Sequence, residues 1–338
     1  MDGNSTFRHS NTSVLSVVAI EAPVTVTSAE LDAQLTPAYE RLGLRPGLLE
    51  GLAGIHERRW WPEGTTFADG AVQAGAKALA QAGIDPSRIG LMINSSVSRT
   101  YLEPSTAVEI HHKLGLPSAA MNFDLANACL GFVNGIHVAA TMIDAGHIDY
   151  ALIVNGEDAQ RVQENTIARL CSDQATTGDF FSEFATLTLG SGAAAMVLGR
   201  SDLHHEGHRV AGGVSRAGTE HHELCVGDMD KMHTDARGLM DAGLDLAEAA
   251  WHNDDFDWSD CQRFIIHQVS RVHTSALCER LEIDQKLVPL SFPFFGNIGP
   301  ASVPFTLAHE VDNLLPGDRV LCMGIGSGLN TAFCEIVW

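Results

Sequence analysis

Three short segments in the first part of this chain have similar counterparts, in the same order, in its second part. The pairs are "LMINSSVSR" (91–99) with "FIIHQVSR" (264–271), "FDLANACLGF" (123–132) with "PFFGNIGPAS" (293–302), and "LGSGAAAMVL" (189–198) with "IGSGLNTAFCEIV" (325–337). Chance explains any one pair about as well as relatedness does, but three pairs in one order are harder to dismiss. The repetition predicts two related halves, residues 1–200 and 201–338, with extra residues in the first half near 160–184.

Short apolar runs alternate with longer amphipathic runs along the chain. Runs with the length and composition of buried strands lie at 89–94, 150–156, 185–190 and 193–199. Runs with helical spacing that end at a glycine lie at 67–83 and 130–146. This alternation predicts an α/β protein with a βα sheet unit in each half. If the halves pack about a pseudo-two-fold axis, their equivalent loops meet in the middle.

The formal net charge is -21, because 42 acidic residues stand against 21 basic ones. Such a surface repels nucleic acid and anionic membranes. The apolar run "VLSVVAI" near the N-terminus is too short for a signal core or a membrane span. The 7 cysteines form no CxxC pair, so neither a zinc ribbon nor a redox motif is expected. We therefore expect a reduced, cytoplasmic protein with no nucleic-acid partner and no membrane insertion.

Cys129, His267 and Asn297 lie in loops that would meet between the halves. Cys129 begins an apolar helical run, where backbone N–H groups favour a thiolate and can hold an oxyanion. His267 ends the strand-like "FIIH", where it can exchange a proton or donate to an enolate oxygen. Asn297 offers an amide donor to the same oxygen. Each residue taken alone also has a structural explanation, as a buried thiol, a packed imidazole or a turn amide.

The glycine-rich "GIGSGLN" (324–330) does not fit a dinucleotide-binding loop, because a strand rather than a helix follows it. A tight strand–turn–strand fits better, and its backbone N–H groups can face the cleft. We expect Gly326 and Ser327 to bind substrate there, with the Ser327 amide donating to an acyl oxyanion.

Glu103 precedes Pro104 in a run of turn-forming residues. A carboxylate placed near an apolar acyl site has a raised pKa and can act as a base. A solvated loop glutamate is the simpler explanation of the same residue. The sequence alone leaves both open.

Several segments together resemble the thiolase superfamily, and in particular its ketoacyl-synthase III branch. They are "GIHERRWW", "NACLGFVNGI", "GSGAAAMVL", "IIHQVSR", "GNIGPAS" and "GIGSGLN". Four longer stretches resemble the OleA-type enzymes of bacterial long-chain olefin synthesis, which join two fatty acyl-CoA molecules head to head without decarboxylation. They are "SVSRTYLEPSTA", "FDLANACLGF", "HQVSRVHT" and "FFGNIGPASVP".

The resemblance implies a five-layered αβαβα thiolase fold, a homodimer and an acyltransferase that yields a 2-alkyl-3-oxoalkanoate. It implies Cys129 as the nucleophile that carries the first acyl group, and His267 and Asn297 as the oxyanion site for the second. Glu103 matches a glutamate that, in this family, acts as the base in the partner subunit's active site. The substrates would be fatty acyl-CoA thioesters, with no cofactor and no metal, and downstream olefin-pathway enzymes would be partners.

The sequence departs from the ketoacyl-synthase III pattern at the CoA site. Leu48 and Leu52 stand where that branch has a CoA-stacking tryptophan and an arginine. The CoA contacts of that branch therefore cannot be carried over. Arg58 and Arg59 are left as candidate phosphate contacts, with a solvated surface position as the simpler explanation.

Two other functions stay open. A decarboxylating ketoacyl synthase that uses a malonyl thioester would release CO₂ and would not depend on Glu103. A metal-binding interaction protein is suggested by histidines in "LHHEGH" (203–208) and "TEHHELC" (219–225), with His204 and His208 at helical spacing. The segment 157–187 is expected to form a lid over an acyl channel or part of a dimer contact.

Overall fold

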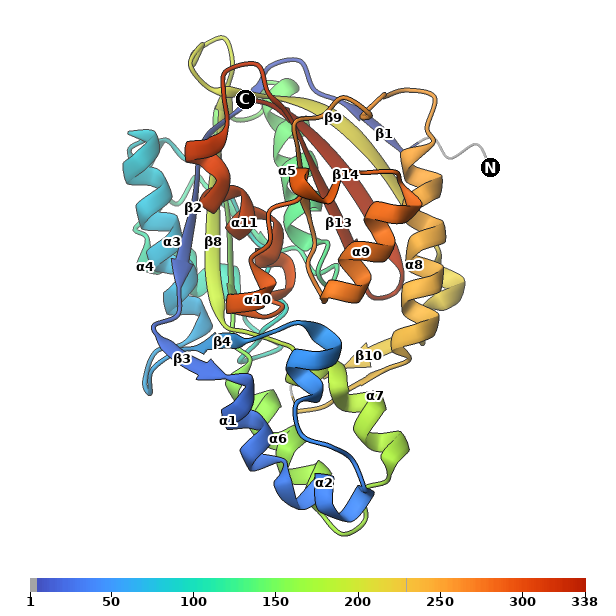
Figure 1. Cartoon of the computed structure of the whole chain (residues 1–338). Helices are drawn as coiled ribbons and strands as arrows, with labels where there is room; N and C mark the ends of the chain where they lie inside the picture. The colour runs from blue at the N-terminus through green and yellow to red at the C-terminus, as the bar shows by residue number, and fades with distance from the viewer. Residues whose placement is uncertain (1–4, 229) are drawn as a thin grey trace.

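The computed structural model of the protein describes residues 5–228 and 230–338 (Figure 1). Ten of the described strands form one mixed sheet, ordered β12-β13-β14-β9-β2-β8-β7-β5-β6, with β1 paired to β9. The strands of this sheet are β1 (Thr6–Arg8), β2 (Thr12–Glu21), β5 (Leu91–Asn94), β6 (Met121–Asp124), β7 (Tyr150–Glu157), β8 (Gly192–Arg200), β9 (His208–Ala217), β12 (Arg263–Ile266), β13 (Arg319–Gly326) and β14 (Asn330–Val337).

The strand order reads alike in both directions from the antiparallel pair β2–β9. Next to these strands lie β8 and β14, then β7 and β13, each antiparallel to its neighbour. Then come β5 and β12, each parallel to its neighbour. The repeated segments occupy matching places, since 91–99 begins with β5 and 264–271 contains most of β12. This symmetry supports the division at residue 200, which stays a prediction.

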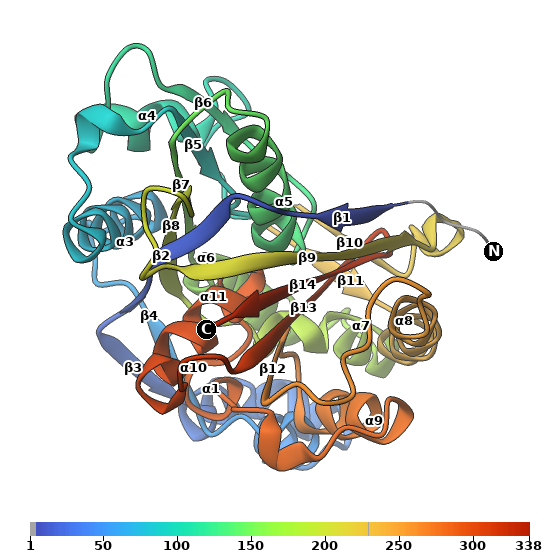
Figure 2. The same cartoon turned by 90° about the horizontal axis from the view of Figure 1, so that it is seen from above.

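The sheet is bent, and helices lie both on its outside and in the space that it encloses (Figures 1 and 2). The helices of these layers are α3 (Phe67–Ala82), α4 (Thr106–Lys113), α5 (Gly131–Asp144), α8 (Ala236–Trp251), α9 (Arg271–Arg280) and α11 (Ser302–Glu310). One apolar core packs α5 and α11 against strands from both ends of the sheet. A second packs α3 and α4 against β2, β5, β7 and β8, and a third packs α8 and α9 against β12, β13 and β14. The expected five αβαβα layers are therefore confirmed.

Alternation along the strands builds these cores. In β5, Leu91 and Ile93 face the central core, while Met92 faces the outer one. In β13, Cys322 faces the central core and Leu321 the other outer core. Because successive side chains of a strand point to opposite faces, strands covered on both sides read as continuous apolar runs. That is why the sequence predicted β5, β7 and β8 correctly.

A smaller lobe lies below the sheet in Figure 1. It contains α1 (Ser28–Gln34), α2 (Thr36–Leu42), α6 (Gln160–Leu170), α7 (Thr177–Leu187) and the hairpin of β3 (Val24–Thr27) with β4 (Glu57–Trp60). Leu31, Leu35, Leu170 and Phe180 share its apolar core. The structure describes one further α-helix and two further strands. They are the short helix α10 (Phe292–Phe295) and the strands β10 (Cys225–Gly227) and β11 (Met232–Thr234), which pair as a second hairpin.

The strand predicted at 185–190 is wrong, because α7 extends to Leu187. Thr176 and Asp179 form a reciprocal capping box at the start of α7. Phe180 and Leu187 then fall on one buried face at helical spacing and join the core of the lobe. The run "ATLTLG" read by itself hides this face, since most of the helix lies before it.

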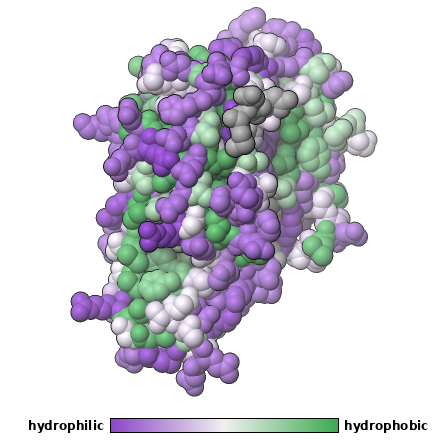
Figure 3. All heavy atoms as spheres, turned by 90° about the vertical axis from the view of Figure 1, so that its right-hand side faces the viewer, coloured by the Kyte–Doolittle hydropathy of each residue, from purple (hydrophilic) through white to green (hydrophobic). Residues whose placement is uncertain are grey.

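The face that carries α8 is mostly hydrophilic, with hydrophobic residues in separate patches (Figure 3). Among the described residues, every helix is too short or too polar to cross a membrane.

Candidate active site

One large cavity, with a volume of about 1430 Å³, opens where the sheet meets the small lobe. Cys129, His267 and Asn297 all line it. Gly326 and Ser327, from the turn between β13 and β14, line it as well. The loops that the repeated segments predicted to converge therefore do converge.

Cys129 lies in the loop between β6 and α5, two residues before the helix begins at Gly131. The preceding residue, Ala128, has a left-handed backbone with a φ of 44°, which is uncommon for a residue with a side chain. The turn at Gly326 packs against this loop: a methyl group added at Gly326 would lie 2.8 Å from the Asn127 carbonyl oxygen. The fold thus holds Cys129 and the glycine turn together.

The expectation that the helix start lowers the pKa of Cys129 is wrong for the free protein. Burial raises the pKa of the Cys129 thiol to about 12, and repulsion from Glu157 and Cys225 adds to this effect. At neutral pH the resting residue is therefore a thiol.

His267 directly follows β12 and is buried, and its backbone N–H donates to the Met323 carbonyl oxygen at 2.8 Å. Burial lowers the pKa of His267 to about 3, with a smaller contribution from His273. The imidazole is therefore neutral, and its Nδ1 atom is buried without a hydrogen-bond partner among the described residues. A neutral imidazole in this place can donate one hydrogen bond to a substrate oxygen.

Asn297 is anchored on both sides. Its backbone N–H donates to the Thr188 carbonyl oxygen at 2.9 Å, and its own carbonyl accepts from Gly190 at 2.9 Å. Its Oδ1 atom accepts from the Gly299 amide at 2.9 Å. The side-chain oxygen is therefore engaged, and the amide nitrogen is the group left to donate toward the cavity.

Glu103 does not line the cavity of its own chain. It lies in an exposed loop of residues 100–104, which we call the finger. Leu102 in the finger is 96% exposed and Tyr101 is 64% exposed. Large apolar side chains exposed to this extent next to an acidic group mark a surface that another molecule can cover.

The expectation that Arg58 and Arg59 contact a phosphate is wrong, since neither lines the cavity. Arg58 has no exposed surface, and it donates to Ser28 Oγ at 3.1 Å and to the Leu187 carbonyl at 3.3 Å. Burial lowers the pKa of Arg58 to about 10. Arg59 pairs with Glu57 at 2.7 Å and lies over the Phe295 ring. Both arginines tie β4 to its surroundings.

The segment 157–187 contributes a wall of the cavity, through Val162 of α6 and Phe181 and Phe184 of α7. Facing it is the β10–β11 hairpin, which lines the cavity with Cys225, Met232 and neighbouring residues. A lid would need this position, and both expected roles of the segment, a lid or part of a dimer contact, stay predictions.

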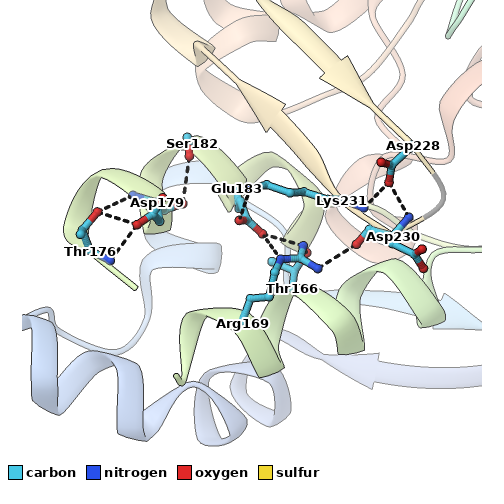
Figure 4. A network of polar contacts seen from close by, with 9 residues as sticks. All are labelled: Thr166, Arg169, Thr176, Asp179, Ser182, Glu183, Asp228, Asp230 and Lys231. Atoms are coloured by element: carbon cyan, nitrogen blue, oxygen red, sulfur yellow. Dashed lines mark hydrogen bonds and ion pairs between the residues drawn. The ribbon is translucent and has the colours of Figure 1, made fainter. Parts of the chain in front are cut away.

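Charged groups hold the hairpin to α6 and α7 (Figure 4). The Arg169 guanidinium pairs with buried Glu183 at 2.7 Å and donates to the Asp230 carbonyl at 2.9 Å. Lys231 approaches the other Glu183 oxygen at 3.6 Å. These contacts hold α6, α7 and the turn of the hairpin together.

Glu157, the last residue of β7, also lines the cavity and was not predicted as a site residue from the sequence. Burial raises its pKa to about 7. The signal for it was present: an acidic residue ends the apolar run "YALIVNGE", where strand ends point toward a ligand cleft.

The histidines behind the metal-binding alternative do not share a helical face. His204 lies in a turn with its Nε2 atom 2.9 Å from the Tyr150 hydroxyl, and His208 begins β9 and stacks on Trp338. Among the residues that the structure describes, no group of three His, Cys, Asp or Glu side chains is arranged to hold a metal ion.

Comparisons with known proteins agree with this geometry. Residues 123–217 match the family model "3-Oxoacyl-[acyl-carrier-protein (ACP)] synthase III", and residues 246–338 match the model of its C-terminal part. An acyl-CoA:acyl-CoA alkyltransferase of Xanthomonas campestris pv. campestris is 46% identical over 97% of this chain and 99% of its own. One of Shewanella oneidensis is 35% identical over 94% of this chain and 96% of its own.

The fold of this chain also matches solved structures. A crystal structure of a cysteine-to-serine variant of Xanthomonas campestris OleA, with bound lauric acid and lauroyl-CoA, superimposes with a TM-score of 0.94. That match covers 98% of this chain and 100% of the other, at 46% identity.

Proposed function

We propose that this chain, which belongs to the 3-oxoacyl-[acyl-carrier-protein] synthase III family, condenses two long-chain acyl-CoA molecules to a 2-alkyl-3-oxoalkanoate without decarboxylation. This proposal rests on the observation that Cys129, His267 and Asn297 line one cavity of about 1430 Å³. This volume exceeds the roughly 300–1,000 Å³ typical of small-molecule pockets. Apolar side chains of the cavity suit acyl chains, among them Leu52, Phe67, Val162, Phe181, Phe184, Met232 and Met240.

The first step forms an acyl-cysteine. The Cys129 sulfur attacks the thioester carbonyl of the first acyl-CoA, a new thioester forms, and the CoA thiol leaves with the proton that Cys129 loses. Since the resting group is a thiol, deprotonation accompanies binding of the acyl-CoA. We assign the oxyanion of this step to the backbone amides of Cys129 and Ser327, because the glycine turn packs against the Cys129 loop.

The second step forms the carbon–carbon bond. The thioester oxygen of the second acyl-CoA accepts from His267 and Asn297, which stabilises the enolate that forms when a base removes the α-proton. The carbanion then attacks the acyl-cysteine carbonyl, and the bond to the Cys129 sulfur breaks. Water finally cleaves the CoA thioester of the product.

We assign the base to Glu103 of the partner subunit in a homodimer. The finger supports this assignment, because Tyr101 and Leu102 line the cavity yet stay largely exposed, while Glu103 beside them does not line the cavity of its own chain. Burying these side chains against a second copy would stabilise the dimer and deliver the carboxylate.

The experiment is to incubate the protein with lauroyl-CoA alone, without a malonyl thioester, and to follow thiol release and product mass. We expect two equivalents of CoA per product and no CO₂. The Cys129→Ser variant should form no acyl adduct on residue 129, while Glu103→Gln should keep the adduct and lose condensation almost completely. A requirement for malonyl thioester, with CO₂ release and indifference to Glu103→Gln, would favour the decarboxylating alternative.

A mixing experiment tests the assignment across subunits. Heterodimers of Cys129→Ser with Glu103→Gln contain one site with both an intact Cys129 and an intact Glu103 from the other chain. Purified heterodimer should reach about half of the wild-type activity, and a random equal mixture, in which half of the dimers are mixed, about a quarter. If Glu103 acts in its own chain, mixing restores nothing.

The remaining expectations follow from this reaction. We propose a cytoplasmic enzyme that needs CoA thioesters as substrates and no further cofactor. Free thiols at every cysteine of the described chain support a reducing compartment. Its product, a free β-keto acid, requires a following enzyme that reduces or activates it, and olefin-pathway enzymes are the partners we propose.

A further inference from the structure

Glu157 is a buried carboxylate that the steps above do not use, and it lies between three functional segments. It lines the cavity, and its charge is close enough to Cys129 to affect that thiol. A methyl group added at Gly299, in the Asn297 loop, would lie 3.5 Å from its Cδ atom. The third segment is the loop after β5, which leads into the finger.

The Glu157 carboxylate accepts hydrogen bonds from four donors. Its Oε1 atom accepts from the Val97 amide at 2.8 Å and from Asn155 Nδ2 at 3.2 Å. Its Oε2 atom accepts from the Ser98 amide at 3.0 Å and the Ser98 hydroxyl at 2.7 Å. Three of these donors belong to Val97 and Ser98, so the carboxylate fixes the backbone of the loop.

Glu157 holds Val97 and Ser98 at one base of the finger, and a different carboxylate pairs with Arg99 at that base and also holds the other base. Asp124 at the end of β6 accepts from the Thr106 amide at 3.0 Å and the Ala107 amide at 2.9 Å. Residues 100–104 project between these two attachments. The direction in which the finger leaves the surface is therefore set by two buried or half-buried carboxylates.

We propose that Glu157 is a positioning residue, whose ionised carboxylate holds Val97 and Ser98 and so places Glu103 for proton abstraction in the partner subunit's site. This inference deepens the proposed function and rests on it. It also means that the same side chain borders the acyl site of its own chain and supports the base sent to the other.

The hydrogen bonds require the ionised form. A carboxylate only accepts, whereas a protonated carboxyl would turn one donor of its own toward the N–H and O–H groups of residues 97 and 98. Burial raises the pKa of Glu157 to about 7, against the lowering effect of these hydrogen bonds. The carboxylate is therefore half ionised near pH 7, so the attachment strengthens as the pH rises above this value and weakens as it falls below it.

Few titratable groups face Glu157. Cys129 is the titratable neighbour across the cavity. Asp158 turns away, since its Oδ1 atom accepts from the Gln160 amide and the Ser191 hydroxyl. The Gly299 loop, Asn155 and the Trp61 indole, which donates to the Glu157 carbonyl at 2.9 Å, carry no charge.

The test separates the two half-reactions in Glu157→Gln. The amide has one acceptor oxygen and turns its NH₂ group toward donors, so it loses part of the attachment while keeping the size of the side chain. Condensation should fall by about 10²-fold, the scale of a misplaced catalytic group. Acyl transfer to Cys129 should fall far less or rise, because loss of the nearby charge lowers the thiol pKa. The pH profile of condensation should lose the acid limb near pH 7.

Ser98→Ala is the second variant, because it removes one donor and leaves both backbone amides. It should show the same pattern with a smaller loss. Hydrogen exchange of residues 97–104, compared with wild type at one pH, is a readout independent of catalysis, and it should accelerate in both variants. If exchange there is unchanged, or if acylation and condensation fall together, the inference is overturned. If wild type itself makes no product from one acyl-CoA while exchange still accelerates, the proposed function has failed and the attachment stands.

Discussion

The strands β5 and β12 hold matching places in the sheet, and the tripeptide Val–Ser–Arg comes two residues after each of them. The residues after the two strands nevertheless make different contacts. After β5, Ser98 donates to Glu157 and Arg99 pairs with Asp124. Both polar groups bind partners within the chain at the base of the finger. These contacts stabilise the finger and leave neither group free for a substrate.

After β12, the corresponding residues leave a donor for substrate. Ser270 caps the start of α9, where its hydroxyl accepts from the His273 amide at 3.2 Å. The Arg271 side chain packs over Gly54. His267, which takes the place of Ser95, lines the cavity, and its neutral imidazole carries one N–H that can donate.

The largest expected difference between the two ends comes from His267→Ala and Ser95→Ala. Loss of the His267 donor should lower condensation by about 10²–10³-fold, as for other oxyanion-hole donors. Loss of the Ser95 hydroxyl removes contacts to Asn155 at 3.2 Å and to the Val154 carbonyl at 3.3 Å, which should cost about 1 kcal/mol of stability and little activity. Steady-state rates and urea unfolding check both, and equal rates in the two variants would contradict the comparison.

The next effect is structural and lies within the β12 end. Gln268 is buried, accepts from the Ser291 amide at 2.8 Å and the Phe292 amide at 3.1 Å, and donates to the Pro289 carbonyl at 2.7 Å. Gln268→Ala should lower the free energy of unfolding by roughly 2–4 kcal/mol, because three buried partners lose their bonds. Measured per folded molecule, it should lower condensation less than His267→Ala does.

The two ends should also respond to pH with opposite signs. Burial lowers the pKa of His273 to about 4, so this group takes up a proton on unfolding and the protein loses stability as the pH falls through 6.5 toward 4. The His273→Leu variant should therefore gain stability relative to wild type as the pH is lowered, by up to about 1.4 kcal/mol per pH unit. Burial raises the pKa of Glu157, so Glu157→Gln should lose stability relative to wild type between pH 7 and 4.5. Urea unfolding at pH 7, 6 and 5 measures both trends.

The smallest effect concerns the cap at Ser270. Ser270→Ala should cost about 1 kcal/mol. Thr27→Ala at the start of α1 should cost about as much, because the Thr27 hydroxyl accepts from the Glu30 amide at 3.1 Å. Thr27 does not line the cavity and serves as the matched control. If Ser270→Ala lowers condensation no more than Thr27→Ala does, the cap stabilises α9 without placing His267.

Much of the fold could be read from local pattern. The apolar runs of β5, β7 and β8 and the glycine-ended helices α3 and α5 were predicted within a few residues, because period and end signals are local. The strand expected at 185–190 failed because its residues complete a buried face that begins at Phe180. The repeated segments also brought Cys129, His267 and Asn297 together correctly, since matching loops of similar halves meet.

What failed at the site depended on surroundings. Arg58 and Arg59 were candidates for a phosphate contact or a solvated surface, but Arg58 donates to the end of α7 and Arg59 lies over a ring of α10. Glu157 was missed because its role comes from Val97 and Ser98, 59 residues or more away in the chain.

The order of chemical groups along the chain, the alternation of strands and helices and the placing of a thiol just before a helix were determined by the sequence itself, because each depends on neighbours a few residues apart. The tertiary structure decided which carboxylate is buried, which arginine is covered and whether Cys129 rests as a thiol. These properties depend on how much water the packed chain removes from each group, and desolvation is set by residues that are distant in sequence.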